Sequence, residues 1–317
     1  MIDRCYIEIT NVCNLSCDFC PKHNRAERRM TAQEFDLITD KLRGRAVFLY
    51  FHLMGEPMLH PLLPDFIRMA REKGFKTVLT SNGTLPVKAM RLLSSLPHKV
   101  QLSLHSHESN GKGILAEYID KVMQFAIHAA EQGTCIVLRL WNQGGRESEN
   151  EQVIQLLEKY VQKPWHERPD GYRLCDNLYL EFDRKFKWPE VQQPPSNSPE
   201  GEGLLYGIEP SNKDFEQKKV TTLSPPRGSR RGADVFCKAL HKQIGVLADG
   251  SLVPCCMDHN GDITLGNLFT QSLDEILESP RAKAMTEGFR HHRATELLCR
   301  NCESGNARNS FRGKPKS

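Results

Sequence analysis

Short runs rich in β-branched and aromatic residues alternate with longer stretches of helical periodicity over the first 185 residues of the chain. A regular alternation of this kind predicts βαβ units and a parallel sheet. The predicted strands cover 4–9, 47–53, 76–80, 100–105, 135–140 and 177–182, and the predicted helices cover 32–42, 62–73, 87–96, 114–132 and 149–160. Six strands are too few for a closed eight-stranded barrel, so we expect an α/β fold of the partial, open (β/α)6 TIM-like type.

The composition of the sequence changes near residue 187. From there to residue 232, Pro, Ser, Gly and scattered charged residues dominate, as in the run Gln-Pro-Pro-Ser-Asn-Ser-Pro at 193–199. This composition can bury little apolar surface and predicts a linker or a substrate-facing loop. The predicted organisation is a partial barrel over 1–186, the linker over 187–232, a small cysteine-rich α+β domain over 233–306 and a basic tail over 307–317.

Composition and charge restrict the class of protein further. The chain has 317 residues, a formal net charge of +4 and 11 cysteines. It shows no signal peptide and no long apolar run, so we expect neither secretion nor membrane insertion. In a reducing cytoplasm, clustered cysteines indicate metal ligands rather than disulfides. The mildly basic balance, without aromatic residues interleaved among the basic ones, does not indicate a nucleic-acid partner. The prediction is a cytoplasmic, oxygen-sensitive protein.

Three cysteines near the start of the chain carry the strongest chemical signal. Cys13, Cys17 and Cys20 follow the first predicted strand with the spacing Cys-x3-Cys-x2-Cys. Three thiolates on one loop can bind three irons of a four-iron cluster and leave the fourth iron open for chemistry. The alternative is a zinc knuckle, although zinc sites usually combine two closely spaced pairs of ligands and no fourth ligand lies near these three in the sequence.

The cysteine motif, with the aromatic Phe19 before its last cysteine, resembles the signature of the radical S-adenosylmethionine (SAM) superfamily. The resemblance implies a [4Fe-4S] cluster on Cys13, Cys17 and Cys20 whose open iron binds the amino and carboxylate groups of SAM. It also implies that the reduced cluster donates an electron and that SAM splits into methionine and a 5′-deoxyadenosyl radical. In such enzymes the cofactors supply the difficult chemistry, and the protein supplies binding, orientation and protection from side reactions.

The segment Met54-Gly55-Glu56-Pro57 follows the second predicted strand and resembles the Gly-Gly-Glu segment of the superfamily, with Met54 in place of the first glycine. By this resemblance its polar groups receive the amino group of SAM. An ammonium group requires a carboxylate or carbonyl partner in a water-poor site, and Gly55 allows the backbone to approach closely. A plain turn before a proline is the alternative interpretation of Gly55 and Glu56.

The next three predicted strands carry the remaining candidates for cofactor binding. Ser81 and Asn82 follow the third strand, Ser103 lies on the fourth, and Arg139 lies on the fifth. The resemblance implies that Ser81, Asn82 and Ser103 contact the ribose hydroxyls and the methionine carboxylate of SAM. The planar guanidinium of Arg139 suits the same carboxylate. Ordinary strand-end turns and a solvated or ion-paired arginine are the alternatives.

A second set of cysteines lies in the C-terminal unit. Asp249-Gly250 predicts the turn of a hairpin over 244–254, and Ser272 begins a capped helix over 272–277. Four thiolates can fully ligate an auxiliary [4Fe-4S] cluster, and the unit resembles a SPASM/twitch-type auxiliary domain. A four-cysteine zinc site is the alternative. The proposed set is Cys237, Cys255, Cys299 and Cys302.

The remaining cysteines stay outside both sets. Cys256 stands next to Cys255. Free thiols donate hydrogen atoms readily to carbon radicals, as a cysteine does in some radical SAM epimerases, so Cys256 is a candidate hydrogen-atom donor. The alternative is a small buried apolar residue. Cys5, Cys135 and Cys175 lie on or near predicted strands, and we expect them to pack in the core.

Together these signals predict a two-cluster radical SAM enzyme that abstracts a hydrogen atom from a small-molecule or peptide substrate. Dehydrogenation, epimerisation and cross-linking are all compatible outcomes. A flavodoxin- or ferredoxin-type reductant is the expected electron-donating partner. Two alternatives stay open: an iron–sulfur electron-transfer or sensing protein without SAM turnover, and a zinc-binding scaffold.

Overall fold

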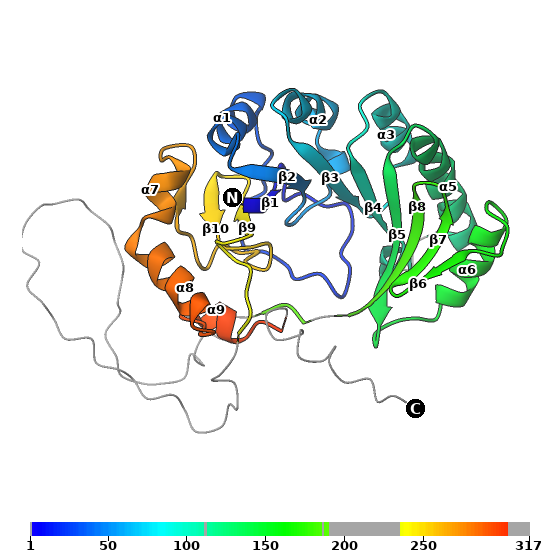
Figure 1. Cartoon of the computed structure of the whole chain (residues 1–317). Helices are drawn as coiled ribbons and strands as arrows, with labels where there is room; N and C mark the ends of the chain where they lie inside the picture. Colours follow the sequence, from blue (N-terminus) through cyan, green and yellow to red (C-terminus); the bar gives the residue numbers. More distant parts are fainter. Residues whose placement is uncertain (1, 111–112, 186, 190–234, 304–317) are drawn as a thin grey trace, which may run out of the picture.

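A curved sheet with helices on its outer face forms the scaffold of the protein (Figure 1). The computed structural model describes residues 2–110, 113–185, 187–189 and 235–303. In these ranges the strands pair in the order β11-β10-β9-β1-β2-β3-β4-β5-β8-β7-β6. The parallel part of the sheet consists of β1 (Ile2–Ile7), β2 (Ala46–Phe51), β3 (Lys76–Ser81), β4 (Lys99–Ser103), β5 (Cys135–Gln143) and β8 (Leu178–Arg184). The partial six-stranded barrel predicted from the sequence is confirmed.

Short strands extend this parallel sheet at both edges. Beside β8 lies an antiparallel hairpin of β7 (Gly171–Cys175) and β6 (His166–Arg168), which the sequence pattern did not predict. Beside β1 lie β9 (Gln243–Val246), β10 (Ser251–Val253) and β11 (Gly266–Asn267). Both edges of the barrel sheet are therefore covered, which removes the unpaired backbone groups that an open edge would present.

The C-terminal hairpin belongs to the same sheet as the barrel. β9 and β10 pair antiparallel, and Gly250 adopts a φ of 83° in the connecting turn, so the hairpin predicted over 244–254 is confirmed. β9 also pairs in parallel with β1, with Cys5 opposite Ile244. The sequence predicted a separate small domain and gave no sign of this pairing, which places the C-terminal cysteines close to the first strand.

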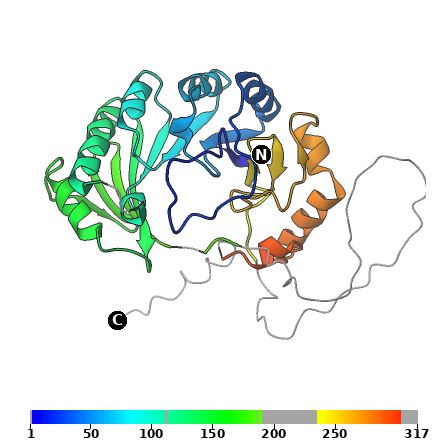
Figure 2. The same ribbon diagram turned by 180° about the vertical axis from the view of Figure 1, so that it is seen from behind.

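Helices cover the outer face of the barrel strands and flank the C-terminal hairpin (Figures 1 and 2). Their bounds lie within a few residues of the predicted ones where a helix was predicted. The helices are α1 (Ala32–Leu42), α2 (Leu63–Glu72), α3 (Pro86–Arg91), α4 (Ser106–Asn110), α5 (Leu115–Glu131), α6 (Asn150–Glu158), α7 (Leu273–Leu277), α8 (Pro280–Arg290), α9 (Leu297–Arg300) and the short 3-10 helices η1 (Pro57–Leu59) and η2 (Leu92–Ser94). The predicted helix over 87–96 is divided between α3 and η2, and α4 was not predicted.

Helix α1 shows how the sequence specifies these elements. Thr31 and Glu34 form a reciprocal capping box at its start, in which each side chain accepts from the other residue's backbone N–H. Phe35, Ile38 and Leu42 recur at helical spacing and are fully buried against the sheet. Each such side chain contributes roughly 1.5–3 kcal/mol by leaving water. The same capping arrangement starts α7, where Ser272 pairs with Glu275, as predicted.

Alternation along β1 directs two sets of side chains to opposite faces of the sheet. Cys5 and Ile7 are fully buried in the main core with the helices. Tyr6 belongs to a separate cluster on the concave side, together with Leu53 and Val253. The functional loops follow the carboxyl ends of the parallel strands, as they do in other barrels of this kind.

Several sequence predictions fall on residues that the structure does not describe. The predicted linker over 187–232 lies outside the described residues except for 187–189, and the predicted tail over 307–317 lies wholly outside them. The domain boundaries therefore stay predictions. Among the described residues, no helix has the length and apolar character needed to cross a membrane. The packing role predicted for Cys175 is wrong, because its side chain is exposed at the sheet edge, whereas Cys5 is fully buried.

Candidate functional site

The loop with the first cysteine motif follows β1 and lies on the concave side of the sheet (Figure 2). Cys13 and Cys20 are exposed, Cys17 is half-buried, and none of the three forms a disulfide. Partial burial raises the pKa of each thiol, that of Cys20 to about 12. Because metals bind the thiolate form, a bound metal would have to displace these protons. Three accessible thiols on one loop fit the ligand set of a cluster with one open iron.

The turn that contains Gly55 and Glu56 packs directly against this loop. The Glu56 N–H donates to the Val12 carbonyl at 2.8 Å. Gly55 has a φ of +76°, and a Cβ there would lie 2.4 Å from the Thr10 carbonyl oxygen. A side chain at Gly55 would therefore collide with the backbone just before Cys13, and the expected approach of Gly55 to SAM stays a prediction.

Glu56 is buried, and its carboxylate forms hydrogen bonds with the segments that follow β2 and β3. Its carboxylate accepts from the N–H of Met58 at 2.9 Å and from the N–H of Asn82 at 2.8 Å. Burial raises the pKa of this carboxyl group, and the hydrogen bonds from Asn82 and Met58 oppose that rise. Ser81 is buried beside Asn82, and its hydroxyl accepts from the Gly83 N–H at 3.1 Å.

Asn82 links the end of β3 to the cysteine loop. Its side-chain amide donates to the side-chain oxygen Oδ1 of Asn14 at 3.0 Å. The side-chain amide of Asn14 in turn donates to the hydroxyl of Thr84 at 2.8 Å. On the other side of the loop, the N–H of Asp18 donates to the Ser109 hydroxyl at 2.9 Å. The loop is therefore hydrogen-bonded from β3 on one side and from α4 on the other.

Phe19, the aromatic residue of the motif, packs inward from the loop. Its ring lies 4.9 Å from the ring of His105, centroid to centroid, and its carbonyl accepts from the Trp188 indole N–H at 3.0 Å. The Trp188 ring also packs edge-on against His259 of the C-terminal unit, with centroids 5.5 Å apart. The segment after β8 thus contacts both cysteine-bearing parts of the chain.

Ser103 and Arg139, predicted separately, are direct neighbours on β4 and β5. The guanidinium Nη2 of Arg139 donates to the Ser103 hydroxyl at 2.7 Å and lies 4.2 Å over the ring of Trp141. Arg139 is buried, and burial lowers its pKa to about 10. Its Nε–H has no hydrogen-bond partner, and among the described residues no carboxylate lies within ion-pair distance. Arg139 is therefore buried rather than solvated, and its role toward SAM stays a prediction.

His52 is a buried neighbour of the proposed site residue Arg139 that the sequence reasoning missed. It follows β2, and its ring packs edge-on against the rings of Tyr6 and Tyr50 at 5.4 and 5.7 Å. Its Nδ1 is buried and has no partner. Burial, together with the charge of nearby Arg139, lowers the pKa of His52 to about 3, so the ring is neutral. A lone histidine after an aromatic strand has no sequence signature that distinguishes it from a core residue.

The second set of cysteines lines one cavity. Cys237, Cys255, Cys299 and Cys302 share this cavity with the apolar side chains of Pro189, Val235, Pro254, Met257 and Leu298. Burial raises the pKa of the Cys237, Cys255 and Cys299 thiols, and the neighbouring cysteines add to the rise. Four cysteines that line one cavity fit the ligand set of a fully ligated cluster. Among the described residues, no group of three or more His, Cys, Asp or Glu side chains is close enough to hold a single metal ion.

Cys256 belongs to other surroundings than the four cysteines of this cavity. Its side chain packs against the cluster of Tyr6, Leu53, Leu247 and Val253. Burial raises the pKa of the thiol to about 11. The thiol is therefore protonated at neutral pH, and Cys256 is not among the residues that line the cavity of the other four cysteines.

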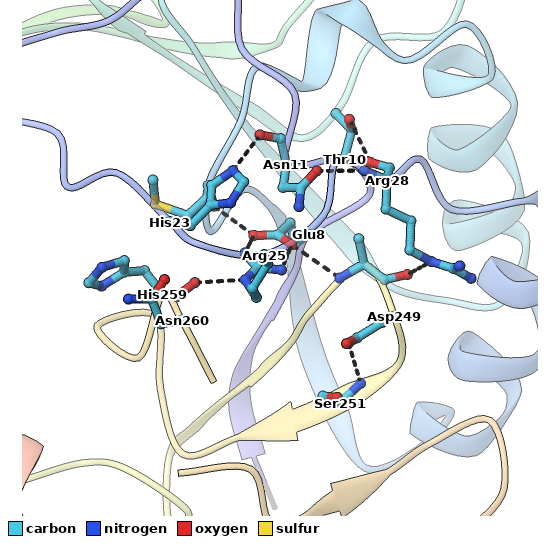
Figure 3. A network of polar contacts seen from close by, with 12 residues as sticks. Glu8, Thr10, Asn11, His23, Arg25, Arg28, Asp249, Ser251, His259 and Asn260 are labelled. Atoms are coloured by element: carbon cyan, nitrogen blue, oxygen red, sulfur yellow. Dashed lines mark hydrogen bonds and ion pairs between the residues drawn. The ribbon is translucent and has the colours of Figure 1, made fainter. Parts of the chain in front are cut away.

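A buried carboxylate joins the first loop to the C-terminal hairpin (Figure 3). Glu8 is fully buried and forms a two-bond ion pair with Arg25 at 2.6 and 2.7 Å. The same carboxylate accepts from the N–H of Ala248 at 3.1 Å and from the N–H of Met54 at 3.2 Å. Arg25 also donates through Nε to the His259 carbonyl at 3.0 Å. The segments that contain Arg25, Met54 and Ala248 are therefore all bonded to the Glu8 carboxylate.

Comparison with known families agrees with this arrangement. The profile of the Radical SAM superfamily matches residues 7–163, and the profile of SPASM, an iron-sulfur cluster-binding domain, matches residues 237–303. The chain belongs to the radical SAM superfamily and carries a SPASM-type C-terminal domain. This membership implies SAM, a [4Fe-4S] cluster and an auxiliary iron–sulfur centre as cofactors. The ligand role of each cysteine stays a prediction.

Curated relatives match parts of the chain and differ in activity. The chain is 34% identical over 85 residues to a tungsten-containing aldehyde ferredoxin oxidoreductase cofactor-modifying protein of Pyrococcus furiosus, covering 25% of this chain and 24% of that protein. It is 24% identical over 139 residues to neomycin C epimerase of Streptomyces fradiae, covering 43% of this chain and 46% of the epimerase. In both cases the match spans less than half of the relative.

Solved structures share the fold over nearly the whole chain. SuiB of Streptococcus suis bound to its precursor peptide SuiA has a TM-score of 0.58 at 18% identity, covering 99% of this chain and 74% of SuiB. The enzyme anSMEcpe with bound AdoMet and a Kp18Cys peptide has a TM-score of 0.56 at 15% identity, covering 96% and 89%. BtrN with AdoMet and 2-DOIA has a TM-score of 0.51 at 14% identity, covering 95% and 93%. These identities establish the fold alone.

Proposed function

We propose that this chain is a radical SAM enzyme with two [4Fe-4S] clusters. When bound, the first cluster and SAM supply a 5′-deoxyadenosyl radical that abstracts a hydrogen atom from the substrate. The observation that carries this proposal is the convergence of three strand ends on one cysteine loop, through Gly55, Asn82 and α4. The proposed ligands are Cys13, Cys17 and Cys20 for the first cluster and Cys237, Cys255, Cys299 and Cys302 for the auxiliary one.

Arg139 is the proposed anchor for the carboxylate of SAM. Its guanidinium is buried, oriented by Ser103, and retains an N–H without a partner. A buried donor without an acceptor costs roughly 1–3 kcal/mol, and a carboxylate would satisfy it with a charge-assisted hydrogen bond. Phe19, Gly55, Glu56, Ser81 and Asn82 complete the proposed cofactor site, with Glu56 providing negative charge close to the loop.

A small molecule or a peptide is the proposed substrate class. Two observations on other proteins support this range: SuiB and anSMEcpe are described with peptides, and BtrN with the small molecule 2-DOIA. The proposed electron donor is a flavodoxin- or ferredoxin-type protein, and the proposed location is the cytoplasm. Dehydrogenation, epimerisation and cross-linking all begin with the same hydrogen abstraction, so the proposal does not depend on which of them follows.

Epimerisation is the outcome that one residue specifically favours. We infer that Cys256 donates a hydrogen atom from its sulfur to the carbon radical of the substrate, because its thiol is protonated and lies on the concave side beside Tyr6. The donation leaves a thiyl radical, which one electron from the flavodoxin- or ferredoxin-type donor and one proton from solvent convert back to the thiol. Cys256→Ala should leave hydrogen abstraction intact but give an oxidised or scrambled product. Unchanged product in this variant would remove Cys256 from the mechanism, and Cys175→Ala, at the exposed far edge, is the matched control.

The decisive test of the enzyme class is the formation of 5′-deoxyadenosine. Protein reconstituted without oxygen and supplied with dithionite and SAM should release it well above the background without protein. Absence of release from protein with full iron and sulfide content would favour an electron-transfer or sensing role. Zinc without sulfide in the purified protein would favour the scaffold.

A further inference from the structure

Asn110, the last residue of α4, forms a hydrogen bond with one of the three loop cysteines. Its side-chain Nδ2 donates to Cys17 Sγ at 3.0 Å and to the Ser106 carbonyl at 2.7 Å. Its Oδ1 accepts from the Ser16 N–H at 3.0 Å. An asparagine amide has two N–H donors and one carbonyl acceptor, so both donors are in use and the carbonyl has a partner. Rotating the amide by half a turn would place its oxygen against the Ser106 carbonyl, so the donor to Cys17 is fixed.

The other two cysteines of the loop have different surroundings. The sulfur of Cys13 is 3.5 Å from the backbone N–H of Leu15, and the thiol of Cys20 donates to the Pro21 carbonyl at 3.6 Å. Both partners belong to the loop itself. Cys17 is thus distinguished by a short contact from a side chain that lies 93 positions away in the sequence and on a separate element.

We propose that Asn110 tunes the reduction potential of the first cluster through its hydrogen bond to the Cys17 sulfur. This inference rests on the proposed function, in which Cys17 is a ligand of that cluster. Reduction adds one electron, and part of the added negative charge resides on the thiolate sulfurs. A hydrogen-bond donor to sulfur stabilises the reduced form more than the oxidised form, and hydrogen bonds to the sulfurs are known to set the potentials of such clusters. Asn110 therefore raises the potential and makes the cluster easier for a protein reductant to reduce.

The fixed orientation of Asn110 makes it a positioning residue with a defined electronic effect. Its carbonyl binds the backbone of Ser16 and its amide binds the sulfur of Cys17, so loop position and sulfur solvation depend on different atoms of one side chain. The substitution Asn110→Ala removes both contacts. Asn110→Asp keeps the acceptor for Ser16 but replaces the donor with a negatively charged oxygen, so its potential should fall further than that of Asn110→Ala.

Asn14 provides a matched control on the opposite side of the same loop. Its side chain bonds Thr84 and Asn82, and its contacts to β3 hold the loop without donating to a sulfur. Asn14→Ala therefore reports the effect of loosening the loop, and Asn14→Asp reports the effect of a nearby negative charge. The difference between Asn110→Ala and Asn14→Ala isolates the hydrogen bond to Cys17.

The test is a redox titration of the reconstituted full-length protein, followed by electron paramagnetic resonance. The first cluster is identified by the change in its signal when SAM is added. We expect a lower midpoint potential in Asn110→Ala than in wild type, a still lower one in Asn110→Asp, and iron content equal to wild type. Asn14→Ala should leave the midpoint near the wild-type value.

Two results would overturn the role of Asn110. One is a midpoint in Asn110→Ala equal to that of wild type, and the other is an equal fall in Asn14→Ala. Neither result affects the proposed function, because the formation of 5′-deoxyadenosine by wild-type protein is measured independently. If wild type shows no signal that responds to SAM, the proposed function fails first.

Discussion

The two cysteine-bearing regions of this chain differ in the surroundings of their thiols. The first places two of its three thiols in contact with solvent and is held by polar side chains from β3 and α4. In the second, four half-buried or buried cysteines line one cavity with apolar walls. A metal centre that must admit a ligand needs an open position, while a centre with a complete ligand set is best protected from water. The polar surroundings of the first region therefore suit the proposed SAM-binding cluster, and the apolar walls of the second suit the proposed auxiliary cluster.

The largest expected effect tests this division directly. Cys17→Ala should abolish 5′-deoxyadenosine formation, because the first cluster loses one of only three protein ligands. Cys302→Ala should retain part of this activity while losing the absorbance of the auxiliary centre, because SAM does not bind there. Anaerobic turnover assays and visible spectra of both reconstituted variants check the prediction. Equal loss of activity in the two variants would contradict the separation of roles.

The ion pair that joins the two regions should contribute strongly to stability. Arg25→Met leaves the Glu8 carboxylate buried without its cation, and breaking a buried pair in this way typically costs about 3–5 kcal/mol. Denaturant unfolding of the metal-free protein measures the change in free energy. Arg45→Met, which removes an exposed pair with Asp274, is the control and should unfold almost as wild type does. Similar destabilisation in both variants would show that burial of Glu8 is not the cause.

The contact between Gly55 and the first loop should be sensitive to a single methyl group. Gly44→Ala introduces a side chain at a φ of +71° in open space, which costs about 1–2 kcal/mol through backbone strain alone. Gly55→Ala adds the same strain and a steric conflict with Thr10, so it should destabilise the protein more than Gly44→Ala does. It should also displace the cysteine loop and weaken SAM binding, which calorimetry can measure. Equal stability of the two variants would indicate that the cysteine loop moves aside without a cost in free energy.

The last expected effect concerns His52 and is confined to acidic pH. Burial depresses the pKa of His52 from 6.5 to about 3 in the folded protein. Between these values the unfolded chain binds a proton that the folded protein does not, so this residue destabilises the fold as pH falls from about 6.5 toward 3. His52→Phe should show a shallower loss of stability over that range, measured by unfolding at several pH values. The exposed His166→Gln should follow the wild-type curve, and a shared slope in wild type and His52→Phe would contradict the assignment.

The local features of the sequence predicted much of this arrangement. The motif from Cys13 to Cys20, the capping boxes at Thr31 and Ser272, and the Asp249-Gly250 turn all depend on residues within a few positions of each other. Such short-range signals specify the same local structure wherever the apolar face of the element is buried. They gave the strand and helix order of the barrel and the C-terminal hairpin.

Contacts between distant segments could not be predicted from one sequence. Asn110 meets Cys17 across 93 positions and Glu8 meets Ala248 across 240, and no periodic pattern encodes such pairs. Helix α4 is short and polar, so hydrophobic periodicity did not reveal it. His52 and Arg139 stand out because each has a buried polar atom without a hydrogen-bond partner. This property exists only in the folded chain.

The pairing of β9 with β1 has a consequence for the way the protein is made. A ribosome adds about 5–20 residues per second, so the backbone N–H of Ala248 is synthesised roughly 12–48 s after Glu8, its acceptor. During that interval β1 lacks its pairing with β9, and the Glu8 carboxylate lacks its hydrogen bond from Ala248. We expect iron delivery to the first motif to follow the synthesis of β9, because β9 completes the pairing of β1 and Ala248 completes the hydrogen bonds of Glu8.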